Sequence, residues 1–383
     1  MLKKGEIKIK NLPVEIYYSS FSTPQMEEYH FSFTLKKYSD FKKQLQWLKT
    51  AYENTLKLLN LKEETSVFRR FFCSDLYNQI SYLKKEKFSN PNNYENPTAI
   101  SLINQTPFPP AKISLWAYHI KLPKNKIEKE KKKNNLFIKI GDLIHNWTTG
   151  LIFTEKDSIY DQTKKVIENY IEFLKENDMK ISDNVIRTWF FIQNIDTDYS
   201  EFVKARKEIY EKNGLTKDTH YIASTGVGGF YYDLKAKVLL DAYSISGIKR
   251  DQIKFLSAPK YLSPTYIYGV TFERGVLINY SDRKHIIISG TASINNKGEI
   301  VYPENINLQI ERTITNISAL LKKGGGSLED VMIFVVYIRD LIDYVFVEKK
   351  LREKFKKTPI IFAIAPVCRP GWLVEIECWA VVS

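Results

Sequence analysis

The chain has 383 residues, of which 44% are hydrophobic and 14% aromatic, and its formal net charge is +13. This length suggests about two or three domains, and the hydrophobic fraction is sufficient for their cores. The three cysteines are too few for a disulfide framework, the five histidines lack metal-binding spacing, and no stretch has the roughly 18 apolar residues of a transmembrane helix. The composition therefore predicts a cytoplasmic protein with no metal site and no membrane insertion.

Much of the positive charge lies in one lysine-rich run at residues 121–133. The lysines after its start are Lys124, Lys126, Lys129, Lys131, Lys132 and Lys133. Because acids are mixed into the run, it is typical of a solvated loop rather than of a phosphate-binding surface. We therefore expect no nucleic-acid partner, whereas a small anionic substrate is compatible with the charge.

The first 110 residues predict an N-terminal extension of strands plus one long helix. Residues 1–37 alternate in a strand-like way. Apolar residues then recur every three or four positions between residues 39 and 61, which predicts a helix capped by Ser39 or Asp40. A polar segment with several prolines follows and interrupts regular structure.

The rest of the chain predicts one unit used twice, at residues 111–250 and 251–383. The first copy has a strand at 113–122, a helix at 158–176, a strand at 186–192, a helix at 199–213 and a strand at 237–243. The second has a helix at 307–323, a strand from 331, a helix at 343–357, a strand at 360–365 and a terminal strand. One offset of 147 aligns Gln162 with Gln309, Asn169 with Asn316, Leu174 with Leu321 and Asp183 with Asp330. Chance matching of amphipathic helices is the alternative. A true repeat predicts a ligand cleft between the copies.

Two acids stand out in the terminal strand. Glu375 and Glu377 are two residues apart, so they point to the same face of a largely apolar strand. Such a pair is either solvated at a sheet edge or part of a site. In a pocket, burial would favour the protonated form and keep one proton bound near neutral pH.

Residues from about 262 to 383 resemble the YjgF/RidA family. The matching segments are residues 286–291, Gln309 with Asn316, and residues 374–377. The resemblance implies an α+β fold, so we expect two YjgF/RidA-like α/β sandwich units in tandem, each a mixed sheet packed by two helices, with the extra N-terminal segment. Simple members deaminate imines with an arginine about fifteen residues before the first glutamate of the last strand. Ile360 stands there, which argues against imine deamination.

A narrower resemblance, to the chorismatase and 3-hydroxybenzoate synthase family, covers residues 180–383. Its motifs are Arg187-Thr188-Trp189, Phe202 with Arg206, residues 224–229, Ser263-Pro264, residues 268–274, residues 289–294, residues 337–340 and Cys368-Arg369-Pro370. The family removes pyruvate from chorismate without a metal or organic cofactor. The chain departs from the pattern at Glu273 and at Glu304-Asn305, which puts fine details of substrate binding in doubt.

The resemblance implies a set of site residues. Glu375 matches the catalytic acid, with Glu377 as the fallback, and the alternative for both is a pair of edge charges. Substrate-binding candidates are Arg206, Tyr268, Arg274, Arg339, Arg369, Thr225 and Gly226. Arginine suits a dicarboxylate because its planar fork matches a carboxylate, and Arg206 and Arg339 are the first choices. For each arginine the alternative is a surface ion pair, such as Arg339 with Asp340. Cys368 and Cys378 are expected to be packing residues.

The expected function is therefore removal of pyruvate from chorismate, giving 3-hydroxybenzoate in the favoured case or a dihydroxycyclohexadiene carboxylate. A non-catalytic protein that binds small anions and an imine deaminase are the alternatives. The sequence leaves open whether the chain is a monomer or a homo-oligomer, because an internal repeat can satisfy part of the trimer interface that simple relatives form.

Overall fold

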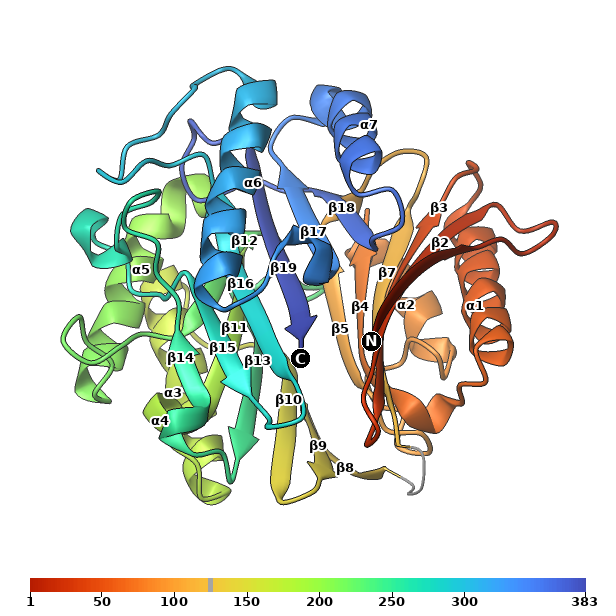
Figure 1. Cartoon of the computed structure of the whole chain (residues 1–383), viewed down its shortest axis with the longest axis horizontal. Coiled ribbons are helices and arrows are strands. Elements are labelled where there is room, and N and C mark those ends of the chain that lie inside the picture. Colours follow the sequence, from red (N-terminus) through yellow and green to blue (C-terminus); the bar gives the residue numbers. More distant parts are fainter. Residues whose placement is uncertain (123–126) are drawn as a thin grey trace.

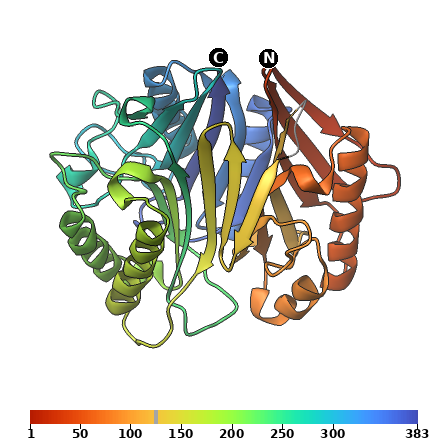
Figure 2. The same ribbon diagram turned by 90° about the horizontal axis from the view of Figure 1, so that it is seen from below.

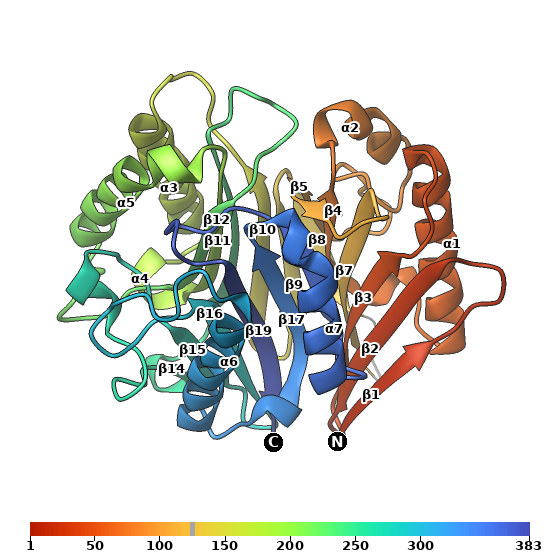
Figure 3. The ribbon, with the colours of Figure 1, turned by 90° about the horizontal axis from the view of Figure 1, so that it is seen from above.

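Three β-sheets meet around a shared core in the computed structural model, which describes residues 1–122 and 127–383. The helices lie on the outside and the sheets turn toward one another (Figure 1), as the view from below also shows (Figure 2). The two termini lie close together (Figure 3). Apart from one two-residue strand, each sheet belongs to a separate stretch of the chain, so the molecule is built of three consecutive units.

The first unit covers residues 2–121. Its strands and helices are β1 Leu2–Ile7, β2 Val14–Ser22, β3 Glu27–Leu35, α1 Phe41–Leu58, η1 Glu63–Thr65, β4 Ser66–Cys73, α2 Leu76–Lys85, β5 Ala99–Asn104, β6 Thr106–Pro107 and β7 Ile113–Lys121. The sheet order is β1-β2-β3-β7-β4-β5. Asp40 begins α1 by accepting a hydrogen bond from the Lys43 backbone N–H at 2.9 Å, as an N-cap does.

The second unit covers residues 128–246 and repeats this topology. It consists of β8 Glu128–Lys132, β9 Asn135–Ile140, β10 Leu143–Leu151, α3 Ile159–Glu176, α4 Ile181–Asn184, β11 Val185–Ile192, α5 Ile195–Lys212, β12 Ala223–Gly228 and β13 Val238–Ser246. The sheet order, β8-β9-β10-β13-β11-β12, matches that of the first unit strand for strand.

The third unit covers residues 250–382 and has the same order again, β14-β15-β16-β19-β17-β18. Its elements are η2 Arg250–Gln252, β14 Ile253–Phe255, η3 Thr265–Tyr268, β15 Gly275–Asn279, β16 Lys284–Ala292, α6 Ile306–Lys323, η4 Leu328–Asp330, β17 Val331–Ile338, η5 Leu341–Asp343, α7 Tyr344–Lys354, β18 Ile360–Ile364 and β19 Val374–Val382. The short strand β6 of the first unit pairs with β18 and extends this sheet.

One buried glutamine marks the repeat in all three units. Gln44, Gln162 and Gln309 are each the fourth residue of the first helix of their unit. Each side chain ties the segment before its helix to the loop that leads into the last strand. The partners are Lys37, Pro110 and Lys112 for Gln44, Lys156, Lys235 and Lys237 for Gln162, and Tyr302, Gly371 and Leu373 for Gln309. This shared bond pattern argues against chance as the source of the repeat.

The predicted α+β fold with tandem sandwich units is confirmed, and a third unit occupies the place of the predicted N-terminal extension. The predicted boundary between residues 110 and 111 needs correction, because β7 lies at the centre of the first sheet between β3 and β4. The sequence pattern also missed α2.

The three sheets bury a common aromatic cluster, in which Trp147 stacks on Phe68 and on Trp379 from the other two units.

The lysine-rich run forms a strand rather than a solvated loop where the structure describes it. Lys124 and Lys126 lie outside the described residues. In β8, the Lys129 amino group donates to the backbone oxygen of Ser66 in the first unit, and Lys131 donates to those of Pro91 and Thr98. Burial lowers the pKa of Lys129 to about 7. Two lysine side chains of the run therefore join the second unit to the first by hydrogen bonds. None of the described helices is long and apolar enough to cross a membrane.

Candidate active site

A small cavity lies at the junction of the second and third units. It measures about 30 Å³. The second unit contributes Tyr199, Arg206, Ser224 and Gly226, and the third contributes Tyr268, Val270, Phe272, Arg274, Gly290, Ala292, Ile294, Cys368, Arg369, Trp372 and Glu375. The cavity therefore lies between the two copies that the sequence predicted.

Glu375 is held in the cavity wall by the strands on either side of it. In β19 it faces Tyr337 of β17 and Ala292 of β16, next to a register shift in the β16 pairing. A Cβ atom at Gly290 would overlap the Oε1 atom of Glu375, so only glycine leaves room for the carboxyl group there. The Glu375 side chain is 4% exposed and receives no hydrogen bond from any residue in the described ranges.

The environment of Glu375 favours its protonated form. Burial raises the pKa of Glu375 to about 8, and the charge of Glu377 acts in the same direction. The guanidinium groups of Arg187 and Arg274 act in the opposite direction. A carboxyl group with this pKa carries its proton at neutral pH and can donate it to a bound ligand.

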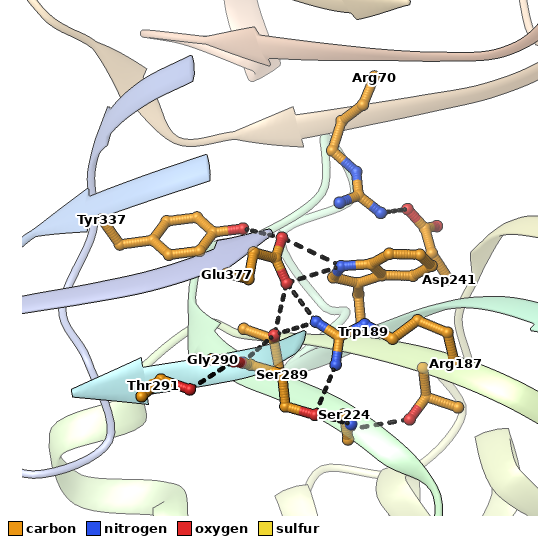
Figure 4. Close-up of polar contacts among 12 residues, drawn as sticks. Arg70, Arg187, Trp189, Ser224, Asp241, Ser289, Gly290, Thr291, Tyr337 and Glu377 are labelled. Atoms are coloured by element: carbon orange, nitrogen blue, oxygen red, sulfur yellow. Dashed lines mark hydrogen bonds and ion pairs between the residues drawn. The ribbon is translucent and has the colours of Figure 1, made fainter. Parts of the chain in front are cut away.

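Glu377, in contrast, is fully engaged by its neighbours (Figure 4). Its carboxylate forms a buried ion pair with Arg187 and accepts hydrogen bonds from the Trp189 indole N–H at 3.0 Å, the Thr225 hydroxyl at 2.5 Å and the Tyr337 hydroxyl at 3.0 Å. The two acids on one face of β19 thus have different surroundings. Glu375 faces the cavity without a hydrogen-bond partner among the described residues, whereas Glu377 is part of a structural network.

The network around Glu377 also fixes the cavity wall. The Thr225 hydroxyl accepts a hydrogen bond from the Gly290 backbone N–H at 2.9 Å and one from Arg187. The Ser289 hydroxyl accepts from Arg187 at 3.0 Å and donates to the backbone oxygen of Glu273 at 2.6 Å. These bonds join β12 to β16 and hold Gly290 against Glu375.

Three guanidinium groups line the cavity without a carboxylate partner in the described part of the chain: Arg206, Arg274 and Arg369. Arg206 is 2% exposed, and one of its nitrogens, Nη2, has no hydrogen-bond partner there. Its Nε donates to the Thr271 hydroxyl at 3.1 Å. Arg274 donates to the backbone oxygen of Ser263 and Arg369 to that of Gly298, so their positive charges remain uncompensated.

Aromatic rings and a thiol complete the wall. The ring of Tyr268 lies 5.3 Å from the Arg274 guanidinium and 4.4 Å from that of Arg369, and Trp372 lies 5.0 Å from Arg369. These contacts place the cations by cation–π attraction. Burial raises the pKa of Cys368 to about 12, so this residue carries a neutral thiol.

The structure brings most of the predicted site residues together. Glu375, Arg206, Tyr268, Arg274, Arg369 and Gly226 line the cavity, and Thr225 lies behind its wall. Arg339 does not line it. Its guanidinium binds both carboxylate oxygens of Asp196, at 3.0 and 2.9 Å, and the backbone oxygen of Val367. The alternative of an ion pair is therefore correct for Arg339, with Asp196 as the partner instead of Asp340.

Some lining residues were not assigned from the sequence. Tyr199 and Trp372 were not among the predicted site residues. Cys368, which was expected to be a packing residue, also lines the cavity. The sequence contained a signal for Cys368, because this residue precedes Arg369 in the family motif Cys368-Arg369-Pro370. Glu273, where the chain departs from the family pattern, does not line the cavity. Its carboxylate accepts a hydrogen bond from the Tyr221 backbone N–H at 2.8 Å.

The acid at Glu375 has no counterpart in the other two units. In each unit the seventh residue of the strand after the first helix faces one residue of the last strand: Tyr337 faces Glu375, Phe191 faces Leu239, and Phe72 faces Ser114. The register thus places leucine and serine at the positions that correspond to Glu375. One of the three junctions has the unpaired acid.

The position two residues later is conserved in type in one further unit. Asp241 corresponds to Glu377, and its buried carboxylate pairs with Arg70 of the first unit at 2.9 Å (Figure 4). Glu377 pairs in the same way with Arg187 of the unit before it. The corresponding residue of the first unit is Trp116. An ion pair at this position therefore joins units at two of the three junctions, whereas the acid in the cavity is particular to one junction.

Comparisons with known proteins agree with this architecture. A family model described as Endoribonuclease L-PSP matches residues 276–382. A RutC family protein of Pyrococcus abyssi is 38% identical over 98 residues, which are 25% of this chain and 76% of the relative. A crystal structure of a chorismatase aligns with a TM-score of 0.63 and 16% identity, over 83% of this chain and 93% of the other. The YjgF/RidA-like fold predicted for the C-terminal residues is confirmed, and the likeness to the chorismatase is one of fold.

Proposed function

We propose that this chain, which belongs to the RutC family, is an enzyme that removes pyruvate from chorismate in the cavity around Glu375. The observation that carries the proposal is the pairing of a buried, unpartnered acid with a pKa of about 8 and three arginines that lack carboxylate partners among the described residues. The likeness in fold to a chorismatase supports it.

The arginines suit the charge of this substrate. Chorismate has two carboxylates, and Arg206, Arg274 and Arg369 offer more positive charge than these two groups require. Because the site excludes bulk water, each charge-assisted hydrogen bond there is stronger than in solvent. A protonated Glu375 adds no negative charge to oppose the dianion, so the protonation state that favours binding also favours chemistry.

Glu375 would act as the general acid. Its proton is transferred to the methylene carbon of the enol ether, which becomes a methyl group, and positive charge develops on the pyruvyl carbon and the ether oxygen. The neighbouring ring hydroxyl then attacks the ring carbon, the carbon–oxygen bond to pyruvate breaks, and the hydroxyl proton returns to the Glu375 carboxylate. The resulting epoxide opens and loses a ring proton to give 3-hydroxybenzoate.

The wall of the cavity favours this intramolecular route over attack by water. Val270, Ala292, Ile294 and Trp372 are apolar, and Cys368 presents a neutral thiol. The cavity is narrow, about 30 Å³, so we expect part of the wall to move when a ring substrate binds. The η3 turn is the candidate, because Tyr266 and Ile267 are exposed while Tyr268 faces the cavity. Water in the closed complex would instead give the dihydrodiol acid.

Two other functions remain alternatives. A non-catalytic anion-binding protein would use the same arginines but would not need a protonated acid. Imine deamination fits less well, because Ile360 stands where simple family members have the arginine for this reaction. Ile360 is fully buried in β18 and does not line the cavity. Neither alternative accounts for the raised pKa of Glu375.

The decisive experiment couples pyruvate release from chorismate to lactate dehydrogenase. The products are separated by chromatography against 3-hydroxybenzoate, 4-hydroxybenzoate and the dihydrodiol. Pyruvate with 3-hydroxybenzoate is the expected result. Calorimetric binding of chorismate without pyruvate release would establish the anion-binding alternative, and ammonia release from enamines would establish the deaminase.

Arg206→Lys should raise KM for chorismate by roughly tenfold to a hundredfold. Lysine keeps the charge but loses the fork that can grip a carboxylate while Nε stays on Thr271. Arg339→Lys is the matched variant, because Arg339 lies outside the cavity and pairs with Asp196. Initial-rate kinetics should show the smaller change for Arg339→Lys, and the reverse order would remove Arg206 from the binding site.

Gly290→Ala should reduce turnover and lower stability by about 1–3 kcal/mol, because the new methyl group overlaps the Glu375 carboxyl and forces it to move. Gly226→Ala adds a methyl group to the opposite wall, where the nearest atoms of Phe202 and Tyr199 lie 3.9 Å away. Thermal unfolding and steady-state rates of both variants test this. Equal effects of the two substitutions would contradict the assigned role of Gly290.

A further inference from the structure

A second and larger hollow lies on the outer face of the third unit, and it shares no lining residue with the cavity around Glu375. Figure 1 shows α6 and α7 there, with strands of the sheet visible between them. The space enclosed by the two helices and by residues 258–261, here called the outer groove, measures about 930 Å³. Its apolar lining residues include Ala258, Ile310, Ile314, Ala319, Leu328 and Leu351.

The edge of the outer groove is basic. Its charged residues are Lys260, Lys322, Lys323, Lys350, Lys354, Glu311 and Glu353. Glu311 is already paired with Lys350 at 2.7 Å. The groove thus combines an apolar floor with an excess of positive charge, which is the complement of an acidic segment with exposed apolar side chains.

The same unit presents such a segment at residues 340–346, here called the acidic knob. Leu341, Ile342, Val345 and Phe346 are 45%, 84%, 59% and 43% exposed. Asp340 precedes them and Asp343 lies among them, and neither forms an ion pair with another described residue. Burial and the charge of Asp340 raise the pKa of Asp343. Four large apolar side chains exposed in one short segment are typical of an interaction surface.

The acidic knob and the outer groove lie at opposite ends of α7. Phe346 is one helical turn before Lys350 and two turns before Glu353 and Lys354, so these positions follow one face of the helix. This face is apolar and acidic near its start and mostly basic near its end. Two copies of α7 placed antiparallel would bring each apolar start against the basic end of the other.

We propose that a second copy of this chain occupies the outer groove, with the acidic knob of each copy inserted into the groove of the other around a twofold axis near the middle of α7. Such a contact is isologous and closes on itself, so it gives a dimer and not a filament. The interface that simple relatives use for trimers does not compete with it, because the three units face one another within one chain.

Sedimentation velocity of the full chain, over concentrations up to about 100 µM, tests the proposal. The wild type should sediment as a dimer that dissociates on dilution. Ile342→Asp should weaken association at least about tenfold, since it places a charge in the apolar contact. Asp218→Lys changes an exposed charge on another unit and should have no effect.

A charge exchange separates this interface from others. Asp343→Lys and Lys354→Glu should each weaken the dimer, because each places like charges in contact, and the two together in one chain should restore much of the affinity. A chain that stays monomeric throughout the series would overturn the proposal. So would a dimer that is insensitive to these substitutions.

Discussion

Glu375→Gln should lower the turnover of chorismate by about 10²- to 10⁴-fold, the usual contribution of a general acid, while the chain stays folded. Glutamine has nearly the shape of the protonated carboxyl group, but its amide group cannot act as an acid and transfer a proton to the substrate. Gly290, which makes room for the carboxyl group, makes the same room for the amide. Coupled pyruvate assays give the rate, and Glu375→Asp is the control that keeps an acid.

The same substitution should stabilise the protein above neutral pH. The folded chain keeps the Glu375 proton up to about pH 8, whereas the unfolded chain releases it near its ordinary pKa of 4.5. Folding therefore costs more free energy as pH rises from 4.5 to about 8, and at pH 7 this cost is on the order of 3 kcal/mol. Glutamine does not ionise and avoids the cost.

Thermal unfolding of both proteins across pH measures this difference. The melting temperature of Glu375→Gln should exceed that of the wild type at pH 8, and the difference should narrow toward pH 4.5. A loss of activity with a gain of stability is what a strained functional group gives, whereas a structural residue would lose both. Equal stability at every pH would mean that Glu375 is not sheltered from water.

The family motifs predicted the cavity better than they predicted each contact. Glu375, Arg206, Arg274 and Arg369 share one cavity because β19, α5 and the loops before β15 and β19 meet at one junction. Arg339 is the exception. Its partner Asp196 is 143 residues away in sequence, at the start of α5 in another unit, and no local pattern relates the two.

The third unit was hidden for a related reason. Gln44 makes the same bonds as Gln162 and Gln309, but the surrounding sequence has diverged, and α2 lies next to a segment rich in asparagine and proline. Lys129 and Lys131 were also misjudged. Alternating Glu and Lys is typical of a solvated stretch, whereas in β8 one face of the strand packs its lysine stems against the first unit.

Glu377→Gln should destabilise the fold by about 3–5 kcal/mol, the usual cost of leaving one partner of a buried ion pair alone. Arg187 is 1% exposed, and burial lowers the pKa of its guanidinium while the charge of Glu377 opposes that effect. Trp189, Thr225 and Tyr337 would also lose a charged acceptor. Chemical denaturation measures the loss. Glu377→Gln with Arg187→Met removes both charges and should recover part of the stability.

The pH dependence of Glu377→Gln separates its electrostatic effect from its structural one. Wild-type turnover should fall as pH rises through about 8, because Glu375 must carry its proton to act. The charge of Glu377 contributes to this raised pKa, so its removal should move the fall in activity to lower pH. A purely structural Glu377 would lower the rate at every pH and leave the midpoint unchanged. The residual activity of the variant, measured from pH 5 to about 9, therefore shows whether Glu377 contributes to the raised pKa of Glu375.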